Sequence, residues 1–351
     1  CVTEASMNIL DRIKSFLKIE EVLTSGRNLH VDALKGLSIM CVLIIHSIQV
    51  NDPNYDNNTL HTVLFPFQMP LFMLLSGFII TSQLRNTFSG YLKKYLLRLI
   101  VPFFVWATVS YIVYRFFYDV SLPVYLFSVA KAPDTGRWFL WVLFLNSVFL
   151  FAVLKLIQIR KWTRWENYIV IASIIAARAA STNLFGLAEF RLYYPYYVAG
   201  YFACKYFDVL KARIKIIYAL SIVGFPLLIL GWKRNAFPAF YPFLVDIFGE
   251  TGFARLIVSV YKYVVAFMGM ALLSFLLHSI RQTRFYLCCC WVGTLTLDIY
   301  VCHSYFLFGL GDKAWQYLSA AAISFVCSLL LTLLVLKRFK ITRMLFLGQN
   351  R

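Results

Sequence analysis

The chain has 351 residues, of which 61% are hydrophobic, 18% are aromatic and only 14% are charged. A soluble domain is roughly half apolar and about a quarter charged, so this composition, with a mean hydropathy of +0.72, excludes an ordinary soluble globular protein. The formal net charge is +18, but Lys and Arg are grouped in short clusters between apolar runs, which argues against nucleic-acid binding and for signals of membrane orientation.

Apolar runs of about 20 residues recur along the chain, and this is the length that crosses a hydrocarbon layer of about 30 Å. We predict an all-α integral membrane protein with about ten transmembrane helices. The ten candidate spans lie at residues 33–50, 62–81, 96–118, 138–157, 168–181, 192–206, 216–232, 256–279, 285–309 and 315–336. The fifth span is short and contains Arg178, and the sixth contains Pro195, so these two are the weakest.

Positive charge alternates between the connections that join these spans. Lys and Arg are frequent before the first span and in every second connection, for example residues 85–98 and 205–215, and they are sparse in the others, for example residues 51–61. Cytoplasmic connections carry the excess of Lys and Arg, so the even-numbered connections and both termini are predicted to be cytoplasmic. The expected division is a cytoplasmic N-terminal segment (1–30), a ten-helix transmembrane domain (31–337) and a cytoplasmic tail (338–351).

No cleavable signal peptide is expected, because the first apolar run follows about 30 residues of mixed polarity and lacks a small-residue cleavage site. The eight cysteines show no metal-ligand spacing with histidines, so no metal site is predicted.

Ionisable side chains interrupt the first apolar run, "HVDALKGLSIMCVLIIHSIQ" from His30. Lys35 and His46 are eleven residues apart, so on a helix they lie within roughly 20° of one another and roughly 16 Å apart along the axis, and Asp32 lies on the same side. Ionisable side chains on one helix face are energetically unfavourable in contact with lipid, and we call the face with Asp32, Lys35 and His46 the polar stripe. The helices are therefore expected to surround a polar cavity that this stripe faces. The alternative is that His46 only forms a hydrogen bond with a neighbouring helix.

A second histidine, His303, lies in the late apolar run "WVGTLTLDIYVCHSYF". Its predicted span crosses the membrane in the same direction as the first, so both histidines are expected in the outer half. Asp298, five residues earlier, is read most simply as a hydrogen-bond partner between helices. His30, His61 and His278 lie near span ends, where a histidine can reach water, and no chemical role is predicted for them.

Several motifs resemble the membrane-bound acyltransferase 3 family, and its fucose 4-O-acetylase-like branch in particular. "D-x-L-K-G" from Asp32, followed by a histidine eleven residues after the lysine, is similar to the family's first helix. The further similar motifs, in order along nearly the whole chain, are "FQMPLFMLLSGFII" from Phe67, "KKYLLRLIVPFF" from Lys93, "RWFLWVLF" from Arg137, "TLDIYVCHSYF" from Thr296 and "MLFLG" from Met344. The extra extracellular esterase-like domain of some members is absent from this sequence.

The resemblance implies an enzyme that transfers an acyl group, usually acetyl from acetyl-CoA, to a hydroxyl of an envelope glycan or a lipid-linked oligosaccharide. It implies a multi-pass protein of the bacterial plasma membrane. The predicted catalytic residues are His46, His303 and Asp32. His46 is interpreted either as a general base or as a covalent acyl carrier, and the sequence leaves both open.

Cations on the predicted cytoplasmic side suit the phosphates of coenzyme A, because Lys and Arg are ready partners for phosphate. The predicted donor-binding residues are Lys35, Arg98, Ser76 and Gly77. Ser76 and Gly77 would let a backbone approach the donor closely, although they are equally interpretable as a small pair for helix packing. Lys93 and Lys94 near Arg98 are interpreted mainly as topology signals.

Two other functions remain open at this point. Ten spans with buried charges would also suit a transporter or flippase of a polyprenyl-linked glycan, which would consume no acetyl-CoA. An acyltransferase for a small cytoplasmic molecule is less consistent with two histidines in the outer half. Neither the acceptor sugar nor the acyl length can be read from the sequence.

Overall fold

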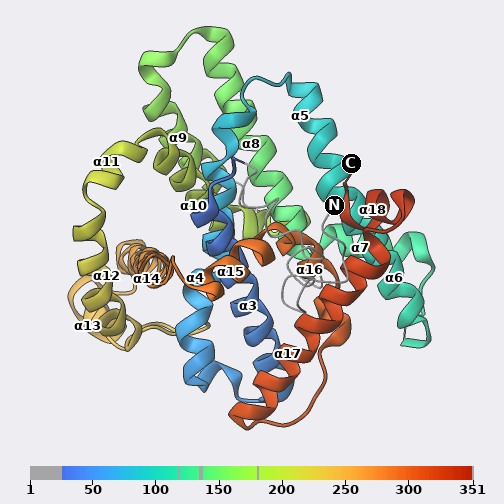
Figure 1. Cartoon of the computed structure of the whole chain (residues 1–351). Coiled ribbons are helices and arrows are strands. Elements are labelled where there is room, and N and C mark those ends of the chain that lie inside the picture. Colours follow the sequence, from blue (N-terminus) through green and yellow to red (C-terminus); the bar gives the residue numbers. More distant parts are fainter. Residues whose placement is uncertain (1–25, 118, 134–136, 180–181, 350–351) are drawn as a thin grey trace. The chain divides into compact units, whose positions relative to one another are not determined.

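The computed structural model describes residues 26–117, 119–133, 137–179 and 182–349. These residues form helices joined by turns and short loops, and no strand occurs among them (Figure 1). The predicted all-helical fold class is therefore confirmed for the described part of the chain.

Six helices among the described residues are long and apolar enough to cross a membrane. They are α3 (Leu29–Asn51), α4 with its 3₁₀ extension (Thr59–Gln83), α5 continuing into α6 (Phe88–Val113), α8 (Trp138–Arg160), α14 (Gly252–Ser279) and α17 with its last turn (Ala314–Leu336). They coincide with the first four, the eighth and the tenth predicted spans. The chain is thus a multi-pass membrane protein.

The other predicted spans correspond to bent or shorter helices. The ninth is a pair, α15 (Arg284–Thr294) and α16 (Thr296–Cys302) with its 3₁₀ extension to Phe306, and the two parts are bent by 67°. The fifth to seventh correspond to α9 (Glu166–Arg178), α10 (Leu187–Lys205) and α12 (Ile214–Ile229). By length and composition the described helices supply six spans, or seven with the bent pair, so the count of ten stays a prediction.

The chain divides into two compact units. Unit 1 comprises the described part of Cys1–Met69, Ile214–Thr296 and Leu307–Ala322, and unit 2 comprises Pro70–Arg213, Leu297–Phe306 and the described part of Ile323–Arg351. Unit 2 contains three further short helices, α7 (Leu122–Lys131), α11 (Phe207–Ala212) and α18 (Lys340–Leu347). Unit 1 contains the short helix α13 (Tyr241–Phe248).

Glycines bring α3 and α15 into direct backbone contact in unit 1. A Cβ on Gly36 would lie 2.0 Å from the carbonyl oxygen of Cys289, and a Cβ on Gly293 would lie 1.9 Å from that of Asp32. Small residues permit such close helix contacts inside membranes. The contact fixes the first turns of α3 against α15.

Glycines likewise bring the backbones of α4 and α10 into direct contact in unit 2. A Cβ on Gly77 would lie 1.9 Å from the carbonyl oxygen of Tyr197, and a Cβ on Gly200 would lie 1.9 Å from that of Leu74. Gly77 therefore has the packing role that the sequence left as one of two interpretations.

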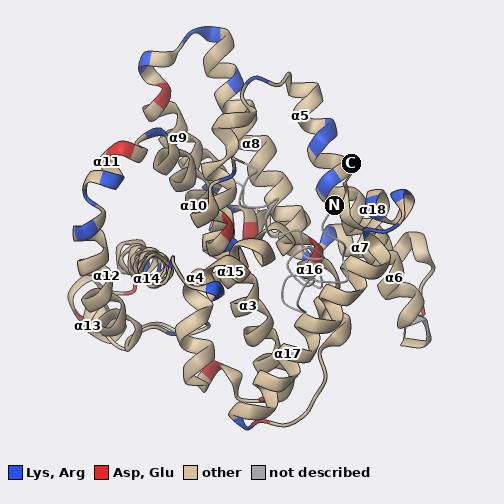
Figure 2. Ribbon diagram, in the orientation of Figure 1, with Lys and Arg blue, Asp and Glu red and all other residues tan. Residues whose placement is uncertain are grey.

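Hydrogen bonds join residues from separate loops in unit 1. In unit 1, the Asn51 side chain donates to the carbonyl of Phe308 and accepts from the backbone N–H of Gly311. The carboxylate of Asp56 accepts from Arg234 and Asn235. The first predicted connection is thus bonded to the seventh and to the start of the ninth, and all three are predicted to face outward. Figure 2 shows where Lys and Arg lie along the helices and turns.

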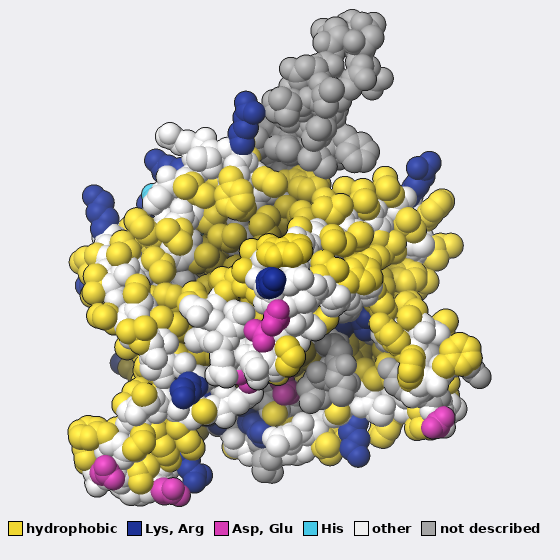
Figure 3. Space-filling model, turned by 90° about the horizontal axis from the view of Figure 1, so that it is seen from below, with side chains coloured by type: hydrophobic (Ala, Val, Ile, Leu, Met, Phe, Trp, Pro, Cys, Tyr) yellow, Lys and Arg dark blue, Asp and Glu magenta, His cyan; other side chains and the backbone are white. Residues whose placement is uncertain are grey.

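Large apolar side chains are widely exposed to the surroundings, and hydrophobic side chains cover much of the face seen in Figure 3. Strongly exposed examples from α6, α9 and α12 are Ile112, Ile175, Leu227 and the following Leu230. Extended apolar surface of this kind is stable in lipid and a liability in water, which agrees with a membrane location.

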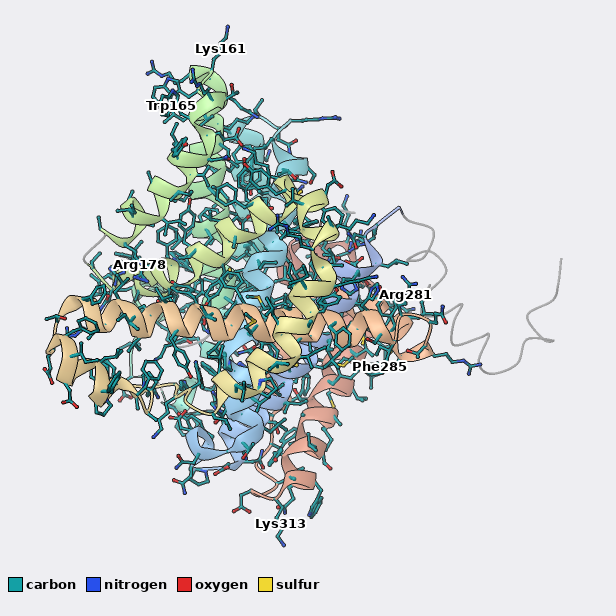
Figure 4. All side chains as sticks on the ribbon, turned by 90° about the vertical axis from the view of Figure 1, so that its left-hand side faces the viewer. Lys161, Trp165, Arg178, Arg281, Phe285 and Lys313 are labelled. Carbon is teal, nitrogen blue, oxygen red and sulfur yellow. The ribbon has the colours of Figure 1, made fainter. Side chains whose placement is uncertain are left out.

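The corner between α8 and α9 combines basic and aromatic residues. Lys161 and Trp165 project there, and Arg178 lies at the other end of α9 (Figure 4). At this corner Glu166 accepts hydrogen bonds from Tyr201 and from Lys205, whose Nζ lies 2.5 Å from Oε1. Burial opposes ionisation of Glu166, but these bonds outweigh it and hold the pKa of Glu166 below its ordinary value. The ion pair thus ties the start of α9 to the end of α10.

Candidate active site

The start of α3 is held by its own flanking residues. The Asn28 side chain caps the helix by accepting from the backbone N–H of His30 and Val31. Arg27 donates two hydrogen bonds to Asp32, at 2.7 and 2.9 Å, and the Asp32 side chain is only 4% exposed. Hydrogen bonding and charge from Asp32 raise the pKa of Arg27. Asp32 lies about 21 Å along the helix axis from His46, so no direct proton transfer joins these two predicted residues.

Lys35 lies half-buried on the first turns of α3. Gly36, the next residue, contacts the Cys289 backbone, so the main chain at Lys35 is fixed by the crossing with α15. This rigid element positions the cation that the sequence predicted for a phosphate.

His46 is half-buried near the far end of α3 and belongs to a short hydrogen-bonded chain. Its Nδ1 lies 3.0 Å from Oε1 of Gln49, and Nε2 of Gln49 lies 3.3 Å from Nε2 of His61 on α4. The amide oxygen can only accept and the amide nitrogen can only donate. His46 therefore carries its proton on Nδ1, and in the neutral ring Nε2 carries none and can accept one.

His61 completes this chain from the neighbouring helix. It is only 1% exposed, so the expectation that it reaches water at a span end is wrong. The rings of Tyr55 and Phe65 pack against it, with centroids 5.3 and 5.1 Å away. Its Nδ1 is buried and has no hydrogen-bond partner among the described residues.

Arg234 covers this end of unit 1. Its guanidinium lies over the rings of Tyr55 and Phe65, 5.4 and 4.7 Å from their centroids, and it pairs with Asp56 at 3.3 Å. Sequence analysis assigned Gln49, His61 and Arg234 no role in the site. Gln49 could have been found, because a residue three positions after His46 lies on the same helix face.

In unit 2, His303 lies where α16 passes into a 3₁₀ turn, and it is 5% exposed. Its Nδ1 donates to the carbonyl of Tyr300 over 2.6 Å, and its own carbonyl accepts from the Ser324 hydroxyl over 2.9 Å. A carbonyl can only accept, so the proton is on Nδ1. His303 thus adopts the same tautomer as His46.

Arg137, at the start of α8, binds the segment that carries His303. It donates to the carbonyl of Val301 and to the hydroxyl of Ser110, each over 3.1 Å. Its guanidinium also lies over the rings of Trp106 and Tyr305. The sequence analysis named Arg137 only as the start of a family-like motif, because a single cation at a helix end gives no hint of the distant segment that it contacts.

Arg98 lies on a π-helical turn, Leu96–Ile100, between α5 and α6. Pro102 lacks the N–H that would bond to the carbonyl of Arg98 and crowds that carbonyl, so the helix widens there. Such π-turns are frequent at functional sites. A cavity of about 540 Å³ opens beside this turn, and its lining residues are Gly90, Lys93, Lys94, Leu97, Arg98, Gly348 and Gln349. Three lining side chains are cationic and none is acidic, which favours an anionic ligand.

Asp298 lies on α16, is 2% exposed and forms an ion pair with Lys337 at 3.0 Å. It also accepts a hydrogen bond of 2.8 Å from the side chain of Gln349. These contacts match the interpretation of Asp298 as a partner between helices.

The predicted site residues fall into two groups. Asp32, Lys35 and His46 lie in unit 1, and Ser76, Gly77, Arg98 and His303 lie in unit 2. Within the described ranges, no group of three or more His, Cys, Asp or Glu residues is arranged to hold a metal ion.

Comparison with known proteins gives a consistent family assignment. A family model described as an acyltransferase domain matches residues 28–337. Nodulation protein NolL of Mesorhizobium japonicum is 26% identical over 226 residues, which are 61% of this chain and 59% of that protein. Nodulation protein NolL of Sinorhizobium fredii is 25% identical over 186 residues, 50% of this chain and 49% of that protein. The chain thus spans about half to three fifths of the length of these curated relatives. No solved structure gives a significant match.

Proposed function

The chain belongs to the acyltransferase 3 family, and we propose that it is an O-acetyltransferase that uses cytoplasmic acetyl-CoA. The acceptor in this proposal is a hydroxyl of an envelope or extracellular polysaccharide, or of its lipid-linked precursor. The observation that carries the proposal is the hydrogen bond that orients the imidazole of His46, in which Nδ1 lies 3.0 Å from Oε1 of Gln49.

In the proposed reaction, Nε2 of His46 takes the proton of the acceptor hydroxyl. The hydroxyl oxygen attacks the carbonyl carbon of the thioester, the carbon–sulfur bond breaks, and the departing thiolate of CoA takes up the proton. General-base catalysis of this kind is worth ~10²–10⁴ in rate. In the covalent variant, Nε2 itself attacks the carbonyl carbon and the carbon–sulfur bond breaks, which releases the thiolate of CoA. The acceptor oxygen then takes the acetyl group from Nε2, and the thiolate takes up the proton of the hydroxyl.

Cationic side chains hold the donor in this proposal. Arg98 contacts phosphate oxygens through its planar, forked guanidinium, with Lys93 and Lys94 beside it in the cavity. Lys35 supplies a further positive charge on α3. Ser76 and Gly77 are retained as predicted donor contacts, although Gly77 packs on Tyr197.

His303 is proposed to orient the acceptor or the reacting groups through its Nε2. Its Nδ1 donates to the carbonyl of Tyr300, so Nε2 is the unprotonated nitrogen of the neutral ring. Asp32 stays a predicted catalytic residue, and its ion pair with Arg27 supports a role in holding the start of α3.

The membrane arrangement is part of the proposal. We propose about ten spans around a polar cavity in the bacterial plasma membrane, with both termini cytoplasmic. The alternating Lys and Arg content of the connections supports this orientation. It would let a cytoplasmic donor meet an acceptor on the outer side.

The test compares envelope polysaccharides from cells that carry the wild-type gene, a deletion, or the His46→Ala variant. Mass spectrometry should show the mass gain of an acetyl group on a sugar only with the wild-type gene. A deletion strain with unchanged acetylation would contradict the proposal. Purified protein that moves a glycan without consuming acetyl-CoA would favour the transporter alternative.

A further inference from the structure

The segment that follows α17 folds back onto the helix that carries Arg98. Within unit 2, Gly348 caps the C-terminal end of α18 with a φ of +62°, and its backbone N–H donates to the carbonyl of Met344. Trp106 of α6 donates from Nε1 to the carbonyl of Phe346 over 3.0 Å. The end of α18 is thereby attached to α6.

Gly348 lies directly against the π-helical turn. A Cβ at this position would lie 2.5 Å from the Cα of Arg98 and 2.5 Å from the carbonyl oxygen of Leu97. The left-handed backbone conformation also favours glycine. No larger residue fits here unless the segment or the Arg98 turn moves.

Gln349 is held by the buried carboxylate of Asp298. Its Nε2 donates to Oδ1 over 2.8 Å, while Lys337 pairs with Oδ2 at 3.0 Å. Buried carboxylates are stabilised by such paired contacts. One carboxylate thus joins α16, the end of α17 and residue 349, and we call the Asp298–Gln349 contact with its Lys337 ion pair the latch.

The latch ends at the cationic cavity. Gly348 and Gln349 form one wall of that cavity, and Lys93, Lys94 and Arg98 line it from α5 and the π-helical turn. A ligand with several phosphate groups matches a cavity whose charged lining residues are all basic. Such a ligand would need this wall in place, because the wall contacts the backbone of Arg98 itself.

We propose that the Asp298–Gln349 latch is a positioning device that closes a polyphosphate site and so sets the affinity for the nucleotide end of coenzyme A. This inference rests on the proposed function for the identity of the donor. It assigns Gln349 and Asp298 no part in the chemistry, so their loss should change donor affinity and leave kcat largely unchanged.

The test uses full-length protein in nanodiscs with four variants. Gln349→Leu removes the amide N–H that donates to Asp298 and adds no charge. Gln349→Glu places two carboxylates beside each other. The double variant Asp298→Asn/Gln349→Glu again pairs an amide with a carboxylate, with their positions exchanged. Gln282→Glu is the matched control. Gln282 is exposed, and its substitution makes the same change of charge outside the latch. The measurements are binding of CoA, and KM and kcat for acetyl-CoA.

Both single variants at Gln349 should raise the Kd for CoA and the KM for acetyl-CoA by about tenfold, as expected for one lost charge-assisted hydrogen bond. The double variant should recover part of that loss, because it restores the amide–carboxylate contact but not the ion pair of residue 298 with Lys337. Gln282→Glu should match wild type. Hydrogen exchange of the peptide that covers residues 343–349 should rise in both single variants, which reports release of the latch without any ligand.

Several results would overturn the inference. An unchanged KM in Gln349→Leu, with a raised KM only in Gln349→Glu, would mean that the added charge acts directly on phosphate. Failure of the double variant to recover affinity would have the same force. If the wild type transfers acetyl groups and both Gln349 variants have an unchanged KM, the latch alone is rejected. If the wild type transfers no acetyl group, the proposed function is rejected, and weaker CoA binding by the variants than by the wild type would still support the latch. If the wild type does not bind CoA at all, the latch and the proposed function are both rejected.

Discussion

The Nδ1 atom of His46 lies 3.0 Å from the amide oxygen of Gln49. The other end of the same amide lies 3.3 Å from His61, so one glutamine joins α3 to α4 and assigns the tautomer of His46. The imidazole is thus oriented by a neutral group rather than by a carboxylate. In the proposed reaction this leaves His46 neutral and basic between turnovers.

Replacement of His46 tests its chemical role directly. His46→Ala should lower acetyl transfer by ~10²–10⁴ and leave CoA binding largely unchanged, because a general base contributes about this factor. His303→Ala should cause a milder loss. His46→Asn is the decisive control, since an amide keeps polar reach but cannot accept a proton at neutral pH. Transfer by His46→Asn within about threefold of wild type would remove the catalytic assignment.

Gln49 should affect kcat and not donor affinity. Gln49→Met keeps the size of the side chain but removes the acceptor of the Nδ1 proton, so His46 can rotate or change tautomer. We expect a fall in kcat of about tenfold or more with little change in KM for acetyl-CoA. Gln49→Glu keeps an acceptor for Nδ1–H and should retain more activity than Gln49→Met. Equal activity in the two variants would contradict the orienting role.

Donor binding should depend on the predicted phosphate contacts. Arg98→Ala and Lys35→Ala should weaken CoA binding, and Arg98→Lys should lose part of the affinity because the forked geometry of the guanidinium is gone. Calorimetry on purified variants gives the affinities, and thermal unfolding checks that each variant is folded. Wild-type affinity in both alanine variants would exclude the phosphate role.

The contact between Asp56 and Arg234 makes the topology testable at two positions that are far apart in sequence. Because Asp56 accepts from both Arg234 and Asn235, cysteines placed at Asn54 and Asn235 should react from the same side. An impermeant maleimide should label both in intact cells, in a background without native cysteines. A cysteine at Gln282, in a predicted cytoplasmic connection, should react only after permeabilisation. The reverse pattern would overturn the orientation.

The Glu166–Lys205 pair predicts a dependence of stability on pH. The pKa of Glu166 is held below its ordinary value of about 4.3, so the folded state favours the carboxylate and the unfolded state binds more protons between the two pKa values. The stabilisation is present above about pH 4.3 and is lost as the pH falls through the lower, folded-state pKa. The effect should be small, since ion pairs near the surface contribute little.

Glu166→Gln provides the comparison for this effect. Wild type should have the higher Tm at about pH 7, and the difference should shrink towards about pH 3. A difference that stays constant across this range would show that the Glu166 carboxylate does not contribute through its charge.

The sequence alone determined the features that depend on consecutive residues. Apolar runs of sufficient length predicted α3, α8, α14 and α17 close to their observed bounds, because a span is a matter of length and hydropathy. The spacing of Lys35 and His46 placed both on α3, because helical geometry is regular. Motifs scattered along the chain indicated the family that the comparison then established.

The tertiary structure decided which side chains meet. Three contacts join segments that are separate in sequence. They are the hydrogen bond from Gln49 to His61, the hydrogen bond from Arg137 to the carbonyl of Val301, and the close packing of Gly348 against the backbone of Arg98. The 67° bend between α15 and α16 likewise divided a run that reads as one apolar span. Local hydropathy sets whether a helix forms and enters the membrane, but the partners of each polar side chain depend on how separate helices pack. For that reason the candidate bases and the neighbouring Gln49 could be read from one stretch of sequence, whereas the contacts from distant segments, those of His61 and Arg137, could not.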